Sequence, residues 1–312
     1  MRGHDTVVMN TIKTLALCAS MIVCSGAFGQ QQAMFTQYMF NGLAINPAYA
    51  GSHRTLSLTA LARIQWAGVD GAPVTQTLSV HAPIANRRVG LGMLLLHDEI
   101  GVTKQTGIYG AFSYRIPFQN GGNLAFGIQG GFNTYNARFS TVSETDPTFA
   151  GADIKEILPN FGAGLFYSTK MFYAGFSVPQ LLQNAFDKYN PDSDAKLLRH
   201  YFFTTGYVFA INKDLMLKPS LLAKVVSGAP VQFDLNFSVL MKEVLWVGLS
   251  WRSFDSVDAL IELQLTDRLQ FGYAYDFATT SEMRRINAGS HEIMLNYRVI
   301  KKRSRVKTPR YF

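Results

Sequence analysis

The chain has 312 residues, of which 48% are hydrophobic, 13% are aromatic and only 16% are charged, with a formal net charge of +8. Beyond the first 29 residues no run of about 18 apolar residues occurs, which excludes the pattern of a transmembrane helix. The basic excess lies in one tail after a nearly neutral body, and this distribution excludes nucleic acid as the expected partner.

Residues 1–29 have the features of a cleaved signal peptide. The start is basic, an apolar stretch follows, and Ala27 and Gly29 place small side chains where a signal peptidase reads them. A lipoprotein signal is the alternative, since both cysteines lie within this stretch, but each follows a bulky residue. We expect the mature chain to begin at Gln30 and to lack cysteine, which excludes disulfides and thiolate metal sites from it.

Residues 30–51 precede the first strand pattern and form a segment of their own. Four aromatic side chains (Phe35, Tyr38, Phe40 and Tyr49) fall within it. A free tail in water is usually poor in aromatic residues. We therefore expect this segment to pack in the mouth of a barrel formed by the strands that follow, or against a partner in the periplasm.

Alternating hydrophobicity characterises residues 52–299. In the clearest stretch, 231–241, every odd-numbered residue is large and apolar, whereas the even-numbered residues up to Ser238 are polar. Because the side chains of a strand point alternately to its two faces, this stretch has one apolar and one polar face. About eleven residues, tilted by ~45°, cross the ~30 Å hydrocarbon core of a membrane. The pattern predicts fourteen strands, at 53–66, 74–83, 88–97, 103–116, 123–137, 160–168, 171–178, 198–211, 215–226, 231–241, 244–252, 257–265, 268–277 and 288–299.

An even strand count favours an all-β fold, a closed antiparallel outer-membrane β-barrel, because closure leaves no unpaired strand edge in lipid. If the first strand starts at the periplasm, the even-numbered connections have six residues or fewer, as periplasmic turns do. The long connections, 138–159, 179–197 and 278–287, all fall on the other side. We expect both termini in the periplasm, with a basic tail at 300–312. Its basic residues are Lys301, Lys302, Arg303, Arg305, Lys307 and Arg310.

Charged residues on the polar face of the strands are expected to point into the lumen. They carry both signs, so two interpretations stay open: an ion-pair network across the lumen, or scattered charges in a hydrated interior. The residues are Arg63, Arg115, Arg199, Lys218, Lys224, Asp234, Arg252, Glu262, Asp276, Glu292 and Arg298.

No catalytic, cofactor or metal site is predicted. His97, Asp98 and Glu99 are consecutive, but neighbours on a strand point to opposite faces, so they do not converge. The other histidines are dispersed, and no set of serine, histidine and aspartate has a spacing that indicates a catalytic triad. We expect a protein that is not an enzyme, with an outer-membrane hydrolase as a minor alternative.

Several motifs resemble the PorP/SprF family of type IX secretion membrane proteins. They are residues 38–41, 45–51, 251–259, 271–276 and 289–293, with 90–92, Asp98 and Gly101 in the third strand region. The similarity covers nearly the whole mature chain. The residues of these motifs that are candidates for family-specific or partner contacts are Asn41, Asn46, Pro47, Tyr49, Gly51, Asp98, Gly101, Asp258, Tyr275, Asp276, Gly289, Ser290, His291 and Glu292.

The resemblance implies an outer-membrane barrel of the type IX secretion and gliding machinery, which assists export or surface attachment of cargo with a C-terminal sorting domain. It implies partners among periplasmic and outer-membrane secretion components, cargo such as a large surface adhesin, and outer-membrane lipid. It does not imply that this chain is the translocation pore. A passive diffusion porin is the alternative. From the residues alone, Asn46, Pro47 and Gly51 have structural roles as well, in an extended turn before the first strand.

Overall fold

A computed structural model describes residues 32–299, apart from residues 33, 54, 85–86, 120, 142–152, 187–195, 281–284 and 286. The expected signal peptide, the mature start at Gln30 and the basic tail lie outside the described residues. Among the described residues, no helix is long and apolar enough to cross a membrane. The strands are β1 (Leu56–Ile64), β2 (Val74–Ile84), β3 (Val89–Ile100), β4 (Thr103–Pro117), β5 (Asn123–Ala137), β6 (Ile154–Ser168), β7 (Phe172–Val178), β8 (His200–Tyr207), β9 (Phe209–Ala210), β10 (Leu215–Val226), β11 (Gln232–Met241), β12 (Leu245–Arg252), β13 (Ser256–Gln264), β14 (Leu269–Ala278) and β15 (Ser290–Val299).

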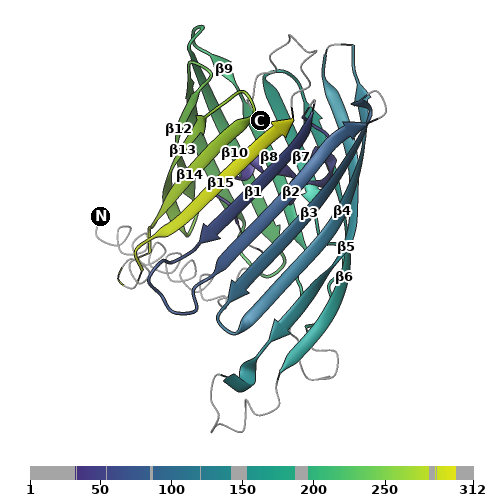
Figure 1. Cartoon of the computed structure of the whole chain (residues 1–312), viewed down its shortest axis with the longest axis vertical. Helices are drawn as coiled ribbons and strands as arrows, with labels where there is room; N and C mark the ends of the chain where they lie inside the picture. The colour runs from purple at the N-terminus through teal and green to yellow at the C-terminus, as the bar shows by residue number, and fades with distance from the viewer. Residues whose placement is uncertain are drawn as a thin grey trace, which may run out of the picture. The chain divides into compact units, whose positions relative to one another are not determined.

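The strands form a closed antiparallel β-barrel with fourteen crossings, as the sequence predicted (Figure 1). Closure comes from pairing of the first and last strands, with Leu56 opposite Val299. Strands β8 and β9 make a single crossing that is interrupted at Val208. The gap in the ladder falls opposite Lys218 and Pro219 of β10. It reflects the missing N–H of Pro219, which removes one ladder hydrogen bond.

Strand β6 begins earlier than predicted, at Ile154 instead of residue 160, so the preceding connection is shorter. The predicted connection ended at Pro159, and proline interrupts most strands. Here Pro159 pairs in register with Phe132 of β5, while its carbonyl accepts from Asn184 Nδ2 at 2.8 Å on the side away from β5. The N–H that proline lacks would point to that same side, so the β5 ladder loses no hydrogen bond.

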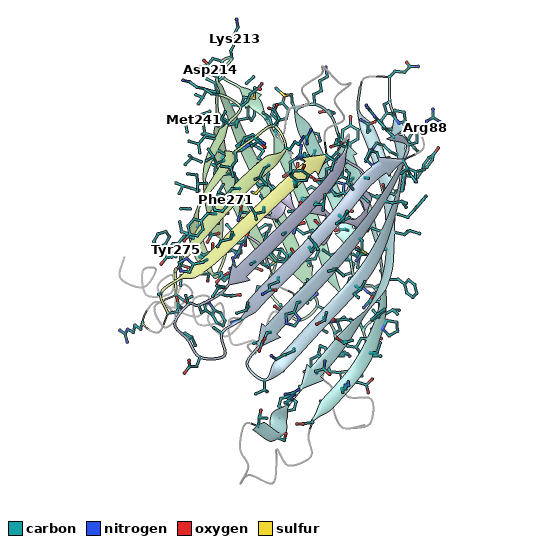
Figure 2. The ribbon with its side chains drawn as sticks, viewed as in Figure 1. Arg88, Lys213, Asp214, Met241, Phe271 and Tyr275 are labelled. Atoms are coloured by element: carbon teal, nitrogen blue, oxygen red, sulfur yellow. The ribbon has the colours of Figure 1, made fainter. Side chains whose placement is uncertain are left out.

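The two ends of the barrel differ in their connections. One end carries 85–88, 118–122, 169–171, 211–214, 242–244 and 265–268, none longer than five residues, and is called the short-turn end. Lys213 and Asp214 lie there, far from Tyr275 (Figure 2). The long connections 138–153, 179–199 and 279–289 share the other end, called the long-loop end. This segregation matches the sequence prediction and the outer-membrane pattern of short periplasmic turns.

Alternation around β11 places Asp234 fully buried in the lumen and leaves 42% of Phe233 and 58% of Phe237 exposed on the outer face. The large apolar side chains of this strand therefore face outward, as predicted. Replacing Phe237 by arginine near the middle of the strand is expected to destabilise the barrel by about 2–4 kcal/mol. Heat-modifiable gel mobility after refolding in lipid measures this effect, with Phe237→Leu as the control. Equal folding of the two variants would show that this face is not in lipid.

Arg199 does not occupy the lumen position predicted for it. It precedes β8, and its guanidinium donates to the carbonyl of Leu181 at 2.7 and 3.0 Å. The neighbouring His200 is the buried residue that starts the inward face of β8. The prediction extended the strand two residues too far, and it also assigned Arg199 the wrong face, since alternation carried back from His200 would point Arg199 outward.

Candidate functional site

Residues 34–53, called the lumen segment, lie inside the ring of strands (Figure 1). The segment folds into three short 3-10 helices, η1 (Tyr38–Phe40), η2 (Gly42–Ala44) and η3 (Pro47–Tyr49). The sequence explains the last of these, because Asn46 Oδ1 accepts from the Ala48 N–H at 2.9 Å and Pro47 occupies the first helical position. Most side chains of the segment are buried.

An ion cluster of five buried residues lines the lumen near the long-loop end. Arg63 Nη1 lies 2.6 Å from Asp276 Oδ2 and 3.3 Å from Glu292 Oε2. Arg252 Nη2 lies 2.9 Å from Asp234 Oδ2. All five side chains are at most 4% exposed, so water does not screen these pairs. The network interpretation is therefore correct for these residues, and the hydrated-interior alternative is wrong for them.

The ion cluster holds the lumen segment at Thr36 and Gln37. Glu292 accepts the backbone N–H of Thr36 at 2.9 Å through Oε2 and that of Gln37 at 2.8 Å through Oε1. The Thr36 hydroxyl donates to Asp276 Oδ1 at 2.9 Å. It also accepts from Arg63 Nη1 at 3.2 Å and Arg252 Nη2 at 3.3 Å. Hydrogen bonds to charged groups are the stronger ones, so this contact is a specific anchor.

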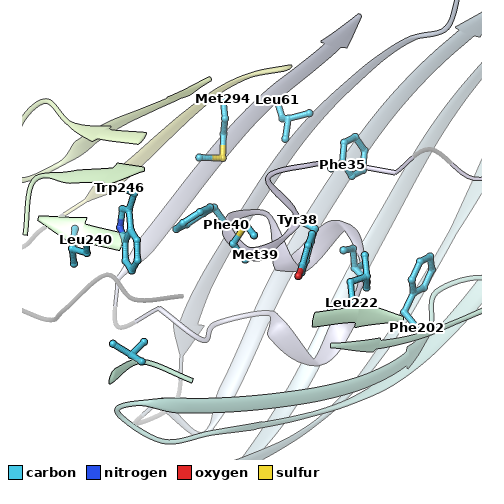
Figure 3. Close-up of a cluster of buried hydrophobic side chains, with 12 residues drawn as sticks. Phe35, Tyr38, Met39, Phe40, Leu61, Phe202, Leu222, Leu240, Trp246 and Met294 are labelled. Atoms are coloured by element: carbon cyan, nitrogen blue, oxygen red, sulfur yellow. The ribbon is translucent and has the colours of Figure 1, made fainter. Parts of the chain in front are cut away.

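The middle of the lumen segment is held by apolar packing and one amide. Phe35, Tyr38, Met39 and Phe40 pack against inward side chains of the surrounding strands (Figure 3). Asn41 donates to Thr77 Oγ1 at 3.1 Å and accepts from Ser79 Oγ at 2.9 Å. The strand residues in this apolar cluster are Leu61, Phe202, Leu222, Leu240, Trp246 and Met294, together with Val208 between β8 and β9.

Lys218 is buried in the same region. Its Nζ lies 4.1 Å from the ring centre of Phe40 and 4.5 Å from that of Trp246. A desolvated ammonium over two aromatic faces is a favourable cation–π arrangement. The lumen segment therefore also provides part of the environment of this buried cation.

The last part of the lumen segment contacts the short-turn half of the barrel. Asn46 Nδ2 donates to the Leu165 carbonyl at 2.8 Å, and the Ala50 carbonyl accepts from Ser113 Oγ at 2.7 Å. The Gly51 N–H donates to His81 Nδ1 at 3.1 Å. The Tyr49 phenol oxygen lies 3.1 Å from His53 Nε2. Gly51 adopts φ +68°, a conformation that favours glycine.

The wall of the barrel has a space for the lumen segment at Gly127. A Cβ added at this inward glycine of β5 would collide with the backbone of Pro47 and Ala48. Gly127→Ala is therefore expected to destabilise the folded barrel by about 1–3 kcal/mol. Gly110→Ala is the matched control, because a Cβ on this outward glycine of β4 would meet nothing closer than 3.9 Å. Equal urea midpoints for the two variants would contradict the close approach of segment and wall.

The remaining motif residues lie at the long-loop end or on neighbouring turns. Asp98 accepts from Thr75 Oγ1 at 2.5 Å, and Gly101, at φ +56°, donates to the Gly71 carbonyl at 2.8 Å. Asp258 is buried beside the ion cluster, opposite Asp276 in the register.

The motif residues around the last connection support its turn. The Tyr275 hydroxyl donates to the Ala288 carbonyl at 2.6 Å, and Gly289 adopts φ +86°. Ser290 Oγ accepts from the Trp66 N–H at 3.1 Å. His291 points outward, with Nδ1 2.8 Å from the Tyr273 hydroxyl oxygen, opposite the inward Glu292. The contacts of these four motif residues therefore mainly stabilise the turn and the strands beside it.

Sequence reasoning missed Thr36 and Gln37, which are central to the site. Neither residue differs from an ordinary surface residue in the printed sequence, and their contacts with Asp276 and Glu292 join residues 240 or more positions apart. Within the described parts of the chain, no group of three or more histidine, cysteine or acidic side chains is placed to hold a metal ion.

Comparison with known protein families agrees with the resemblance that the sequence motifs indicated. The model of the family described as type IX secretion system membrane protein PorP/SprF matches residues 27–297. The chain is a member of the PorP/SprF family. None of the curated proteins compared is significantly similar to this PorP/SprF protein.

Solved outer-membrane barrels resemble this PorP/SprF member in fold. The monoaromatic hydrocarbon channel CymD aligns over 89% of this chain and 96% of its own, at 11% identity and a TM-score of 0.50. The Acinetobacter baumannii outer membrane protein Omp33 aligns over 79% of this chain and 98% of its own, at 11% identity and a TM-score of 0.46. At these identities the similarity concerns the fold alone.

Proposed function

We propose that this outer-membrane barrel assists the type IX machinery in the export or surface attachment of cargo with a C-terminal sorting domain, without passing cargo through its own lumen. Membership of the PorP/SprF family supports the secretion role. The observation that carries the second part is the lumen segment, which fills the barrel interior.

The lumen segment contacts strands on every side of the barrel. Its hydrogen bonds reach β15 through Glu292, β2 through Ser79, β4 through Ser113 and β6 through Leu165. Its apolar side chains reach β8, β10, β11 and β12. A polypeptide crossing the lumen would have to displace all these contacts. A passive porin would need the same space for solute, so we favour an accessory component that binds other secretion components.

A chromosomal deletion tests the secretion role. A strain lacking this chain is expected to retain cargo inside the cell, and the wild-type gene is expected to restore cargo to the medium or the cell surface. Quantitative immunoblotting of cargo in cell and medium fractions measures this. Normal cargo export in the deletion strain would overturn the proposal. Liposomes containing the purified protein provide the porin test, and rapid swelling in small sugars would favour the alternative.

The basic tail supplies a separate prediction about partners. We propose that it lies in the periplasm, since fourteen crossings return the chain to the side on which β1 begins. Replacing Lys301, Lys302, Arg303 and Arg305 by glutamine is expected to leave the barrel folded and to weaken co-purification of periplasmic components. If attraction to anionic lipid is the only role, at about 1 kcal/mol per basic residue, co-purification and secretion would both stay unchanged.

A further inference from the structure

The lumen segment runs from one end of the barrel to the other. At its carboxyl end, Gly51 contacts His81, three residues before β2 ends at the short-turn end. At its amino end, Thr36 contacts Asp276, two residues before β14 ends at the long-loop end. In chain order the lumen segment therefore runs from the long-loop end to the short-turn end. Its direction is opposite to that of β1, which starts at the short-turn end.

Each strand that holds Thr36 does so close to the long-loop end. Arg252 is the last residue of β12, Arg63 is the second-last residue of β1, and Glu292 is the third residue of β15. All three strand ends border connections at the long-loop end. The position of Thr36 thus rests on several independent strands.

Gln32 gives a second, independent marker of the same path. It lines a cavity of about 40 Å³ together with Asp98, Gln105 and Asn133. These three residues lie on β3, β4 and β5, in the parts of those strands near the long-loop end. The residues before Thr36 therefore do not turn back toward the short-turn end.

We propose that the chain threads its own barrel, so that Gln32 is presented at the extracellular mouth. This differs from the expectation that both termini are periplasmic.

Single cysteines in the otherwise cysteine-free mature chain test the path. Gln32→Cys is treated in intact cells with a membrane-impermeant maleimide. Asp70→Cys, exposed in the connection after β1, is the extracellular control, and Lys213→Cys, exposed in the turn before β10, is the periplasmic control. We expect Gln32→Cys to label in intact cells, as Asp70→Cys does. Labelling only after permeabilisation, as for Lys213→Cys, would overturn the proposal.

Because Gln32 is half-buried, an epitope inserted between Gln31 and Gln32 serves as the second measurement. Antibody binding to intact cells is expected, and binding confined to permeabilised cells would overturn the proposal. The two control cysteines also test the orientation of the barrel. Reversed labelling of the controls would overturn the proposal as well. None of these readouts depends on secretion, so a failure here is distinguishable from a failure of the secretion role.

Discussion

Replacing Arg252 by methionine is expected to destabilise the folded barrel by about 3–5 kcal/mol, because it leaves buried carboxylates without their cation. Arg252 bonds to Asp234 through both Nε and Nη2, at 3.0 and 2.9 Å, and it also lies 3.8 Å from Asp276. Its side chain is 1% exposed. Neither water nor salt can replace the lost charge at such a depth, so the penalty is not screened.

Lys104→Met is the matched control for Arg252→Met. Lys104 pairs with Glu99 at 2.7 Å, but the two side chains are 52% and 40% exposed. A pair of this kind contributes about 0–1 kcal/mol. Urea titration of both variants in liposomes, followed by tryptophan fluorescence, compares the two effects. If Arg252→Met shifts the midpoint no more than Lys104→Met, the ion cluster is not a buried network.

Deleting residues 34–44 is expected to convert a non-conducting barrel into a conducting one. The deletion removes Thr36, the contact to the ion cluster, and four buried apolar side chains that fill the space beside Trp246. Water can then enter a lumen lined by Arg63, Asp276 and other polar groups. Each lost large apolar side chain also removes about 1.5–3 kcal/mol of burial free energy, so the variant is expected to be less stable.

Planar bilayer recording measures this conversion. The full-length protein is expected to show no steady conductance, and the deletion variant to show steady steps. Heat-modifiable gel mobility restricts the comparison to folded protein. Steady conductance of the full-length protein, equal to that of the deletion variant, would show that the lumen segment does not seal the barrel.

The strand framework was predictable from the sequence because a lipid-facing strand repeats its pattern at every second residue. Asp234 and Phe237 were thereby assigned to the correct faces. The predicted start of β6 was wrong, because the strand continues through Pro159, whose missing N–H faces away from the β5 ladder. Arg199 was assigned inward, although it precedes β8 and the inward face of that strand begins at His200.

The contacts of the site were not predictable in the same way. Alternation gives the face of a residue but not its partner, so Arg63 and Glu292 could be placed inward without showing that they pair. The aromatic content of residues 30–51 indicated packing but not a path. Three of the four side chains that bond to Thr36 lie more than 200 residues away, and no local pattern encodes such contacts.

Cross-linking the lumen segment to the barrel wall tests most directly the central claim, which is that cargo does not pass through the lumen. Asn41 of the lumen segment accepts a hydrogen bond from Ser79 of β2, with 2.9 Å between Oδ1 and Oγ. A cysteine at each of the two positions is therefore placed to form a disulfide or to react with a short bis-maleimide. The locked double variant is expressed in the deletion strain, and cross-linking and cargo export are measured together. We predict complete cross-linking with export at the wild-type level. Loss of export on cross-linking, with recovery on reduction of the disulfide, would show that the lumen must open during secretion and would contradict the account.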